Sequence, residues 1–438
     1  MHSPFLIYPR LSSLSVRSLT FAIICMAALS SPGCGKNVVP RTEAETKPKN
    51  SLGSVAVTGI PMWLGNPSRS FYGTGPWPEE PLEILWSVKT KLISGRLHDD
   101  GWGGSSWPGQ PSVMGDRVYF GSADGSLYCL SLQDGTLVWS FETEDSLKST
   151  PTLAGDRIIV SGLDHFVYCV NRIDGSLIWK YQTGFEVDGS AAVVDGRVYF
   201  GGEDGYYYCL NLEDGALVYK TERLGSMEGS SCVIGANIYV GTEQGDLYCL
   251  KLNDGTVVWR ARIGADSDST PAVANQFVYT AAENGYVYCF RMWSGELVWK
   301  FKAEGGLSRF HKERSGFWAS PVVLNGRVYI GSSNGYMYCL KAENGDLIWR
   351  HLVRAPIWGS SPLVDGRVVF GDKAGWLYMI AAEDGRVIWE LKIGDNVNAT
   401  PAIWEGRIYI GAFNGSLHCI GAAQSAGKKK QTAERYAL

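Results

Sequence analysis

The hydrophobic and polar positions along this chain follow one short pattern. Within residues 117–139, two apolar runs, Val118–Phe120 and Leu127–Leu130, are each followed by an Asp-Gly pair. An Asp-Gly pair supplies the positive φ angles that a tight hairpin turn needs, so each run is expected to pair antiparallel with the next. The runs do not alternate between apolar and polar residues, which indicates small sheets with both faces covered by neighbouring sheets.

This pattern returns at a fixed spacing, which a Tyr-Cys pair marks. The pair at 128–129 recurs every 40 residues (168 − 128 = 40) as far as 288–289, and resumes after one step of 50 residues at 338–339. Tyr378-Met379 and His418-Cys419 complete eight copies. Such a period predicts a stacked or circular array, in which each unit buries its apolar faces against its neighbours.

A fourth strand precedes each triplet and carries proline, as in Ser149–Leu153. Because proline cannot donate to a ladder, this strand belongs on an edge, such as the channel edge of a propeller blade. We predict an all-β, eight-bladed β-propeller of four-stranded antiparallel blades, in which Leu82–Val88 completes the last blade and closes the ring. The aromatic residues expected to pack between the blades are Trp86, Trp139, Trp179, Tyr219, Trp259, Trp299, Trp349 and Trp389.

Seven of the ten cysteines occupy one strand position in successive copies, from Cys129 to Cys419. Equivalent strands of adjacent blades lie about 10 Å apart, whereas a disulfide needs Cα atoms within about 7 Å. We therefore interpret these cysteines as small buried hydrophobic residues between the blades. No cysteine or histidine group has zinc spacing, so we expect no metal site of that kind.

Both ends of the chain differ from the repeats. Residues 1–34 have a basic start, an apolar stretch at 19–29 and small residues before Cys34, which indicates an export signal. The sequence around Cys34 resembles a bacterial lipoprotein processing site, at which this cysteine would be lipidated; a simple cleaved signal is the alternative. We expect a flexible tether at 35–61, the propeller at 62–421, with residues 62–66 and 71–73 packed on its outer rim, and a disordered basic tail at 422–438.

Charge narrows the classes of partner. The net charge is −4, from 40 basic and 44 acidic residues, so no overall field favours nucleic acid or an anionic membrane. Membrane association is expected only through the lipid anchor. P-loop, dinucleotide and HExxH motifs are missing from the sequence, and it holds only six histidines.

The segment Asp134–Trp139, with Asp-Gly followed by Trp four residues later, resembles the tryptophan-docking repeat of the PQQ-like propeller superfamily. The motif Asp195–Gly201 resembles it as well. This superfamily includes quinoprotein alcohol dehydrogenases, which hold pyrroloquinoline quinone and calcium on the propeller face. It also includes cofactor-free scaffolds such as BamB, the lipoprotein of the outer-membrane β-barrel assembly machinery. This chain resembles the BamB-type lipoproteins more than it resembles the dehydrogenases.

The resemblance leaves enzyme and scaffold as alternatives. Quinoprotein dehydrogenases typically carry adjacent cysteines, which this chain does not have. Acidic residues that could gather a hard cation fall on one face, but we interpret them as solvated loop acids and expect neither a metal nor a cofactor. These acids are Glu142, Glu144, Asp145, Glu186, Asp188, Glu228, Asp266, Asp268 and Asp395.

Two long connections on that same face mix basic and aromatic residues, which is where binding usually resides on a rigid scaffold. They are residues 89–110 and the connection between Trp299 and Pro321. The candidate partner-binding residues are Arg96, His98, Trp102, Trp107, Arg309, Phe310, His311, Lys312, Arg314 and Trp318.

We therefore expect a non-catalytic, exported, lipid-anchored and monomeric propeller of the periplasm or cell envelope, which binds a protein or an envelope polymer through its loop face. The alternative is a dehydrogenase or a sensor that uses pyrroloquinoline quinone with calcium.

Overall fold

A computed structural model describes residues 59–91, 109–304, 316–422 and 434–436. The chain divides into two units, residues 1–56 and 57–438, and every described residue belongs to the second. The secondary structure of these residues is almost entirely strand. The exception is a short 3-10 helix, η1 (Trp63–Gly65), and no helix of the described residues is long and apolar enough to cross a membrane.

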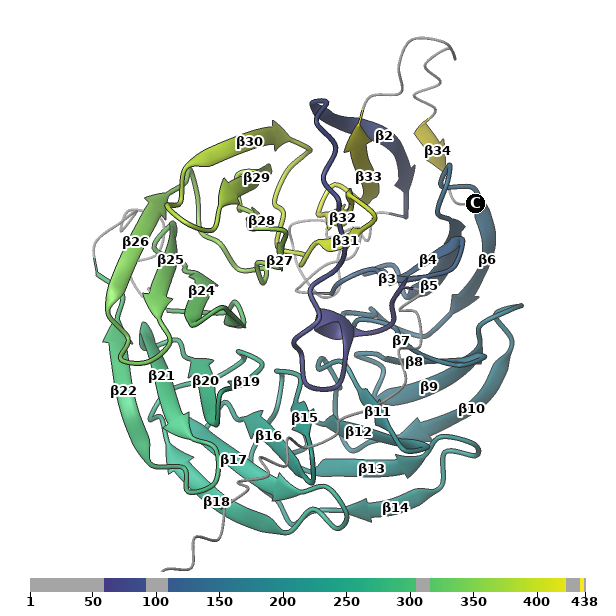
Figure 1. Ribbon diagram of the computed structural model, residues 1–438. Coiled ribbons are helices and arrows are strands. Elements are labelled where there is room, and N and C mark those ends of the chain that lie inside the picture. Colours follow the sequence, from purple (N-terminus) through teal and green to yellow (C-terminus); the bar gives the residue numbers. More distant parts are fainter. Residues whose placement is uncertain (1–58, 92–108, 305–315, 423–433, 437–438) are drawn as a thin grey trace, which may run out of the picture. The chain divides into compact units, whose positions relative to one another are not determined.

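Eight antiparallel sheets follow one another around a central axis, as the sequence predicted (Figure 1). We number them as blades 1 to 8 in chain order, each running from its innermost to its outermost strand. The strands of blades 1 to 4 are β3 (Ser112–Met114), β4 (Arg117–Gly121), β5 (Ser126–Ser131) and β6 (Leu137–Glu142); β7 (Thr152–Ala154), β8 (Arg157–Ser161), β9 (Phe166–Asn171) and β10 (Leu177–Gln182); β11 (Ala192–Val194), β12 (Arg197–Gly201), β13 (Tyr207–Asn211) and β14 (Leu217–Lys220); and β15 (Cys232–Ile234), β16 (Asn237–Gly241), β17 (Asp246–Lys251) and β18 (Val257–Arg262).

The strands of blades 5 to 8 are β19 (Ala272–Ala274), β20 (Phe277–Ala281), β21 (Tyr286–Arg291) and β22 (Leu297–Lys302); β23 (Val322–Leu324), β24 (Arg327–Gly331), β25 (Tyr336–Lys341) and β26 (Leu347–Leu352); β27 (Leu363–Val364), β28 (Arg367–Gly371), β29 (Trp376–Ala381) and β30 (Val387–Lys392); and β31 (Ala402–Trp404), β32 (Arg407–Ala412), β33 (Ser416–Ala422) and β2 (Leu82–Lys89). Two further strands are β1 (Gly59–Ile60) and β34 (Glu434–Tyr436).

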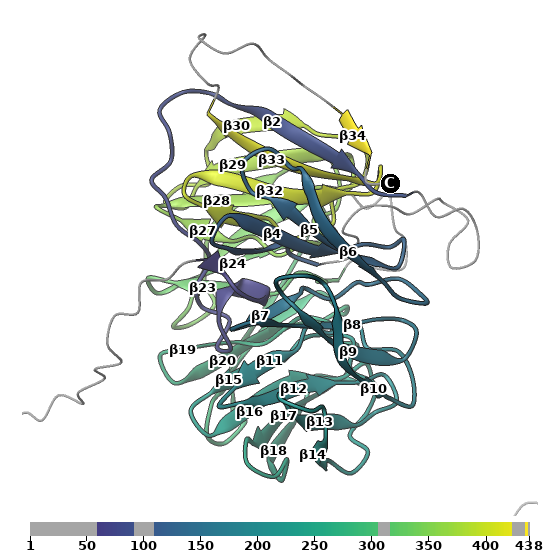
Figure 2. The ribbon, with the colours of Figure 1, turned by 90° about the vertical axis from the view of Figure 1, so that its right-hand side faces the viewer.

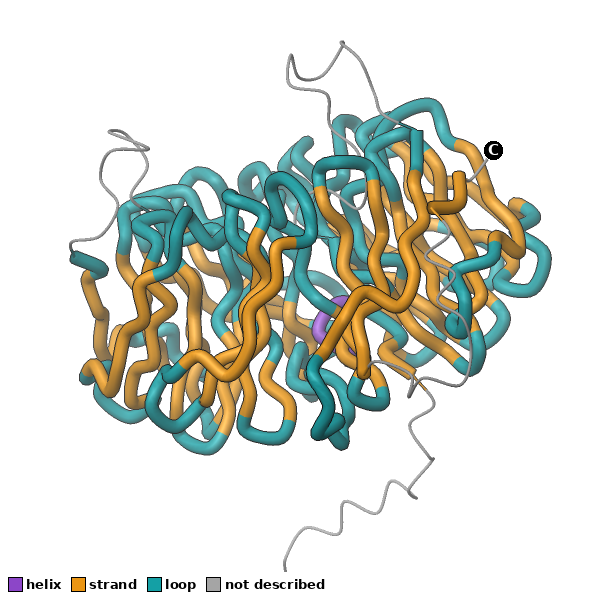
Figure 3. Tube along the Cα trace, turned by 90° about the horizontal axis from the view of Figure 1, so that it is seen from above, coloured by secondary structure: helices purple, strands orange, loops and turns teal. Residues whose placement is uncertain are grey.

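The strands run between two layers of loops (Figure 3). One layer holds the connections between blades and the turns between the second and third strands; we call it the connector face. The opposite layer holds the other two turns of each blade, such as the one at Gly115 and the one at Gly135; we call it the turn face. Both glycines have positive φ, of 61° and 71°, a conformation that glycine adopts more readily than other residues.

The N-terminal strand closes the ring as predicted. β2 pairs antiparallel with β33, and Trp86 lies opposite Cys419, just as Trp139 lies opposite Cys129 in blade 1. Across this junction the hydroxyl of Ser87 and Nδ1 of His418 are 2.7 Å apart. Blade 8 is therefore built from both ends of the chain.

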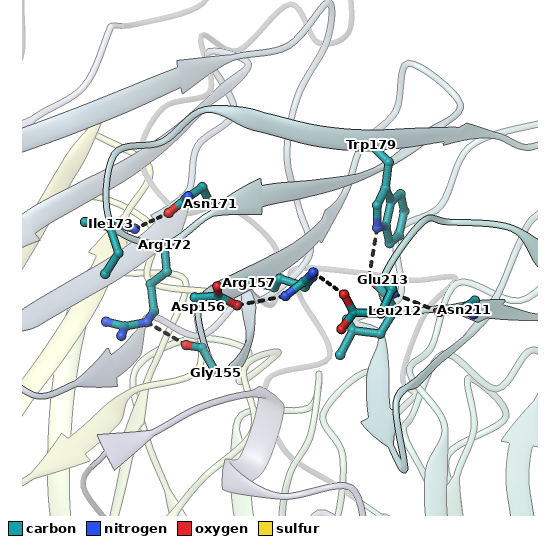
Figure 4. Close-up of polar contacts among 10 residues, drawn as sticks. All are labelled: Gly155, Asp156, Arg157, Asn171, Arg172, Ile173, Trp179, Asn211, Leu212 and Glu213. Carbon is teal, nitrogen blue, oxygen red and sulfur yellow. Dashed lines mark hydrogen bonds and ion pairs between the residues drawn. The ribbon is translucent and has the colours of Figure 1, made fainter.

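The outer-strand aromatics dock on glycines of the next blade. The ring of Trp179 lies against Gly215, whose φ is 71°, and Nε1 of Trp179 donates to the carbonyl of Leu212 at 2.9 Å (Figure 4). A side chain at residue 215 would collide with this ring, since an added Cβ would lie 2.7 Å from it. The seven repeat cysteines are buried and unbridged, which confirms their interpretation as small core residues, and Cys232 is also buried.

Trp259 offers a test of this docking. Its ring lies against Gly295, only 8 % of the residue is exposed, and Nε1 donates to the carbonyl of Met292 at 3.0 Å. Trp259→Ala is expected to lower the free energy of unfolding by about 3–5 kcal/mol, because it removes a buried aromatic ring and leaves a cavity. The neighbouring Val258→Ala is the control, since Val258 is 45 % exposed. Equal costs for the two variants in denaturant titrations would contradict the docking role.

The segment between β1 and β2 lies inside the ring, not on the outer rim as predicted. It crosses the middle of the propeller (Figure 1), and Trp63, Leu64, Tyr72 and Trp77 are buried. β1 pairs with β3, and later residues bond to the inner strands of other blades, such as Trp77 Nε1 to the carbonyl of Val364 at 2.9 Å. The inner strands are edges with unpaired backbone groups, which this segment satisfies.

Arg69 anchors the segment. The residue is 1 % exposed, and its guanidinium donates to the carbonyls of Ser231 at 2.8 Å, Trp63 at 2.9 Å and Ser190 at 3.3 Å. Burial lowers the pKa of Arg69 to about 10, so the group still carries its proton at neutral pH. A fully buried cation therefore ties the central segment to two blades.

Hydroxyl groups also bridge neighbouring inner strands around the channel. Six backbone N–H groups each donate to a side-chain oxygen of the next blade at 2.8–2.9 Å. Each acceptor residue occupies the same repeat position as its donor, one repeat further along the chain. The pairs are Gln110 to Thr150, Thr150 to Ser190, Ser190 to Ser230, Thr270 to Ser320, Ser320 to Ser360 and Ser360 to Thr400.

Two predicted boundaries need correction. The tether expected at 35–61 includes β1, whose residues Gly59 and Ile60 are buried in the ring. The tail expected to be disordered from residue 422 contains the last residue of β33 and also β34, which pairs in parallel with β2. The expected signal segment 1–34, with Cys34, lies outside the described residues.

Candidate functional site

The connector face has a bowl at its centre, where the channel ends against the inner segment. The bowl encloses about 550 Å³, including space open to solvent, and Trp63 contributes to its lining. Its other lining residues come from the connections that lead into successive inner strands, at equivalent positions of the repeat. These include Lys148, Asp188, Glu228, Asp268, Trp318, Trp358 and Asn398.

Carboxylates gather along one side of this bowl, over blades 3 to 5. They form three groups, and within each group the candidate ligand atoms lie within 4.8 Å of one another. We call the whole set the acidic crescent; it consists of Glu186, Asp188, Glu203, Glu228, Glu243, Asp266, Asp268 and Glu283.

The fold brings the crescent together from two kinds of loop. Asp188, Glu228 and Asp268 end the connections into β11, β15 and β19, while Glu203, Glu243 and Glu283 lie in the turns between the second and third strands. Backbone hydrogen bonds hold the two kinds of loop side by side. The N–H of Glu203 donates to the carbonyl of Glu186 at 3.0 Å, and the N–H of Glu283 donates to that of Asp266 at 2.9 Å.

Burial and crowding keep protons on part of the crescent. Burial, and then the charges of Asp188 and other neighbouring carboxylates, raises the pKa of Glu203 and of Glu228 to about 8. The same causes, burial first and Glu228 next, raise the pKa of Asp268 well above its usual range. Carboxyl groups shifted in this way bind an approaching cation in exchange for a proton.

The raised pKa values predict how stability depends on pH. A carboxyl group with a higher pKa in the folded state holds its proton more tightly there, so its stabilising effect is present at low pH and is lost as the pH rises from about 4.5 to 8. We expect the free energy of unfolding to fall over this window, and Glu228→Gln to flatten the fall. Urea titrations from pH 5 to 9 measure it. Glu144→Gln, on an exposed residue outside the crescent, should leave the slope unchanged.

One cation already lies on the crescent. Nζ of Lys148 is 2.7 Å from Oδ2 of Asp188, and both side chains are largely buried, with 18 % and 6 % exposed. Burial alone would lower the pKa of Lys148, but the neighbouring carboxylate of Asp188 outweighs it and raises that pKa. The other Asp188 oxygen, Oδ1, is buried and has no hydrogen-bond partner among the described residues.

The opposite side of the bowl is aromatic. The rings of Trp318 and Trp358 stack with centroids 4.7 Å apart and planes 8° apart. The ammonium of Lys373 lies 3.2 Å from the centre of the Trp358 ring, which is a close cation–π contact. Beside them Asn398 is 1 % exposed, and in the part of the chain that the structure describes neither its side-chain nitrogen nor its side-chain oxygen has a hydrogen-bond partner.

The structure settles the position of some sequence-predicted residues. Of the partner-binding candidates, Trp318 lines the bowl, whereas Arg96, His98, Trp102, Trp107, Arg309, Phe310, His311, Lys312 and Arg314 lie outside the described residues. Of the acids, Glu186, Asp188, Glu228, Asp266 and Asp268 join the crescent. Their interpretation as solvated loop acids suits the exposed Glu142, Glu144 and Asp395, but it is wrong for Asp188, which is buried.

Sequence reasoning missed Lys148, Trp358, Asn398 and the three turn glutamates. A signal for the glutamates was available, because Glu203, Glu243 and Glu283 follow one another at the repeat spacing of 40 (243 − 203 = 40). Lys148, Asp188, Glu228 and Asp268 also share that spacing. Aligning the copies by position would therefore have placed these groups in adjacent blades.

The described residues do not fit pyrroloquinoline quinone. This flat cofactor carries several carboxylates, so it needs cations and an open aromatic face. Among the described residues that line the bowl, Lys148 is the one cation, and it is paired with Asp188. Trp318 and Lys373 both already contact the Trp358 ring. The crescent does offer carboxylate oxygens of the kind that calcium prefers, so the mismatch concerns the quinone.

Comparison with known proteins assigns the class. A family model described as outer membrane protein assembly factor BamB matches residues 83–301 and 245–437, which together span most of the chain. The chain therefore belongs to this BamB-type family of PQQ-like propellers. None of the curated proteins matches it.

Solved structures share the fold at low identity. BamB from Moraxella catarrhalis is 16 % identical, with a TM-score of 0.52 over 78 % of this chain and 99 % of that one. The quinohemoprotein alcohol dehydrogenase from Comamonas testosteroni is 13 % identical, with a TM-score of 0.69 over 86 % of this chain and 83 % of that one. A europium-containing methanol dehydrogenase is 12 % identical, with a TM-score of 0.66 over 84 % and 99 %. At these identities the likeness concerns the fold alone.

Proposed function

We propose that this chain is a non-catalytic scaffold of the cell envelope that binds a protein through its connector face, with the acidic crescent contacting basic side chains of that protein. The observation that carries the proposal is the contact of Lys148 with Asp188 at 2.7 Å. This contact supports the proposal, because it places a largely buried ammonium group among the carboxylates of the crescent. Glu228 and Asp268 continue the same surface into blades 4 and 5.

The family supports the scaffold over the enzyme. The matching family model describes an outer membrane assembly factor, and a protein partner in the envelope follows from that description. The crescent is also chemically suited to such a partner. Arginine and lysine form charge-assisted hydrogen bonds with carboxylates, and these bonds strengthen where water is partly excluded.

Neutralising the crescent tests the proposal. A short arginine-containing peptide serves as the probe in calorimetric titrations of the full chain. Glu228→Gln together with Asp268→Asn is expected to weaken its binding about tenfold or more, since two carboxyl groups that can release a proton and bind a cation are lost. The matched control, Glu144→Gln with Asp395→Asn, removes two exposed acids of the same face and should leave affinity nearly unchanged. Equal binding by the two double variants would reject the crescent as the contact.

Membrane anchoring at Cys34 is part of this proposal and has its own test. Lipidation would retain the chain in the membrane fraction of cells, whereas Cys34→Ala would release it into the soluble envelope fraction. Mass spectrometry of the N-terminal peptide detects the acyl groups directly. An unmodified peptide cut elsewhere would favour a simple cleaved signal.

The quinone-dependent alternative is tested by adding pyrroloquinoline quinone and calcium to the purified chain. The scaffold proposal expects neither a rise in melting temperature with the quinone nor dye-linked alcohol oxidation. Quinone-dependent turnover would overturn it.

A further inference from the structure

The C-terminal strand lies along the strand that closes the ring. β34 pairs in parallel with β2, with Ser87 opposite Glu434, Val88 opposite Arg435 and Lys89 opposite Tyr436. Blade 8 thus has five strands, and β2 lies between β33 and β34. Figures 1 and 2 both show β34 beside β2 on the outside of the ring.

This outer addition is particular to blade 8. In the part of the chain that the structure describes, no strand is added outside the outermost strand of blades 1 to 7. These outermost strands are β6, β10, β14, β18, β22, β26 and β30. Blade 1 also has a fifth strand, but that strand, β1, is added on the inner side.

Burial distinguishes β2 from its equivalents. No residue of β2 is exposed, whereas the outer strand of every other blade has at least three exposed residues. Ser87 is half-buried, while Ser140, its equivalent in blade 1, is exposed. The closing strand is therefore less exposed than the outer strands of the other blades, and β34 borders its last three residues.

The sequence of the outer strands accounts for part of this difference. Charged side chains on an edge strand oppose the addition of another strand. In blades 2 to 7 the residue after the docking aromatic is charged, whereas it is a serine both in blade 8 (Ser87) and in blade 1 (Ser140), so this charge accounts only for the open edges of blades 2 to 7. The charged residues are Lys180, Lys220, Arg260, Lys300, Arg350 and Glu390.

We propose that the outer edge of β2 is a strand-addition site whose occupant is the chain's own C-terminal segment, Glu434–Tyr436, and that this segment latches the closed ring. Without it, the N-terminal strand is held on one side only, by β33. With it, the last three residues of β2 are paired on both edges, so opening blade 8 at this end requires two ladders to separate. The inference is independent of the function proposed for the connector face.

Hydrogen exchange of the full chain tests the latch. In the chain truncated after Ala422, the amides of Ser87 and Lys89, which face β34, are expected to exchange about tenfold faster than in the full chain, because their outer hydrogen bonds are lost, whereas the amide of Val88 faces β33. Amides of β6 provide the control within the same molecule, since that edge has no added strand. Unchanged exchange in β2 after truncation would overturn the proposal.

A single substitution separates backbone pairing from other effects of truncation. Arg435→Pro removes the N–H and restricts φ, and it is expected to reproduce the faster exchange. Arg435→Ala keeps the backbone donor and should retain protection, because the proposal rests on the backbone alone. Protection lost equally in both variants, or retained in both, would reject strand addition at this register.

Discussion

Replacing residues 82–89 with a glycine-serine segment of equal length is expected to unfold the propeller at 25 °C. The change removes the ladder between β2 and β33 and the buried side chains of Leu82, Trp86 and Val88. Each buried side chain of this size contributes about 2–5 kcal/mol, so the loss is comparable to the whole stability of a typical domain, about 5–15 kcal/mol. Circular dichroism and urea titration measure it.

The control for this replacement lies just before the strand. Glu79→Ser with Glu80→Ser alters two exposed residues of the same connection and should change the free energy of unfolding by less than about 0.5 kcal/mol. A β2 replacement that keeps the unfolding midpoint of the native chain would show that the ring does not depend on this strand for closure.

Arg69→Met is expected to lower the free energy of unfolding by about 3–5 kcal/mol, because buried carbonyls of Ser231 and Trp63 lose their charged donor. Arg69→Lys keeps a positive charge but has a compact ammonium group, which cannot span the same carbonyls, so an intermediate loss is expected. Thermal and urea unfolding of the three proteins give the comparison.

A surface arginine provides the control for Arg69. Arg117→Met removes a side chain that pairs with the exposed Asp116 at 2.6 Å, and a cost below about 1 kcal/mol is expected. Similar small losses for Arg69→Met and Arg117→Met would show that the central segment is not anchored by its arginine. If Arg69→Met lowers the free energy of unfolding but still binds the probe peptide, Arg69 contributes to stability and not to the proposed peptide binding.

The site was predicted in parts. Sequence reasoning selected Glu186, Asp188 and Asp268 as acids of one face, yet interpreted them as solvated. Solvation depends on which side chains meet across blades, and the repeat alone does not state how close Glu203 comes to Glu186. The raised pKa values of Glu203 and Glu228 follow from that closeness and from burial, so they are tertiary properties.

The sequence by itself determined the number of blades, the strand order within each and the closure by residues 82–88. Hairpin turns, edge prolines and a repeat near 40 residues are local features. Because all eight copies carry them, each copy predicts the same blade. Cysteine spacing likewise excluded disulfides, because adjacent blades hold equivalent strands too far apart.

Only the tertiary structure decided what lies at the centre and at the outer edge of blade 8. Residues 59–78 occur once and follow no period, so nothing local distinguishes a segment on the rim from one that crosses the channel. Their position is set by unpaired inner-strand groups of several blades, to which Arg69, Tyr72 and Trp77 bond. The pairing of β34 with β2 joins residues more than 300 apart in sequence (434 − 87 = 347), and a three-residue strand carries no signal of its partner.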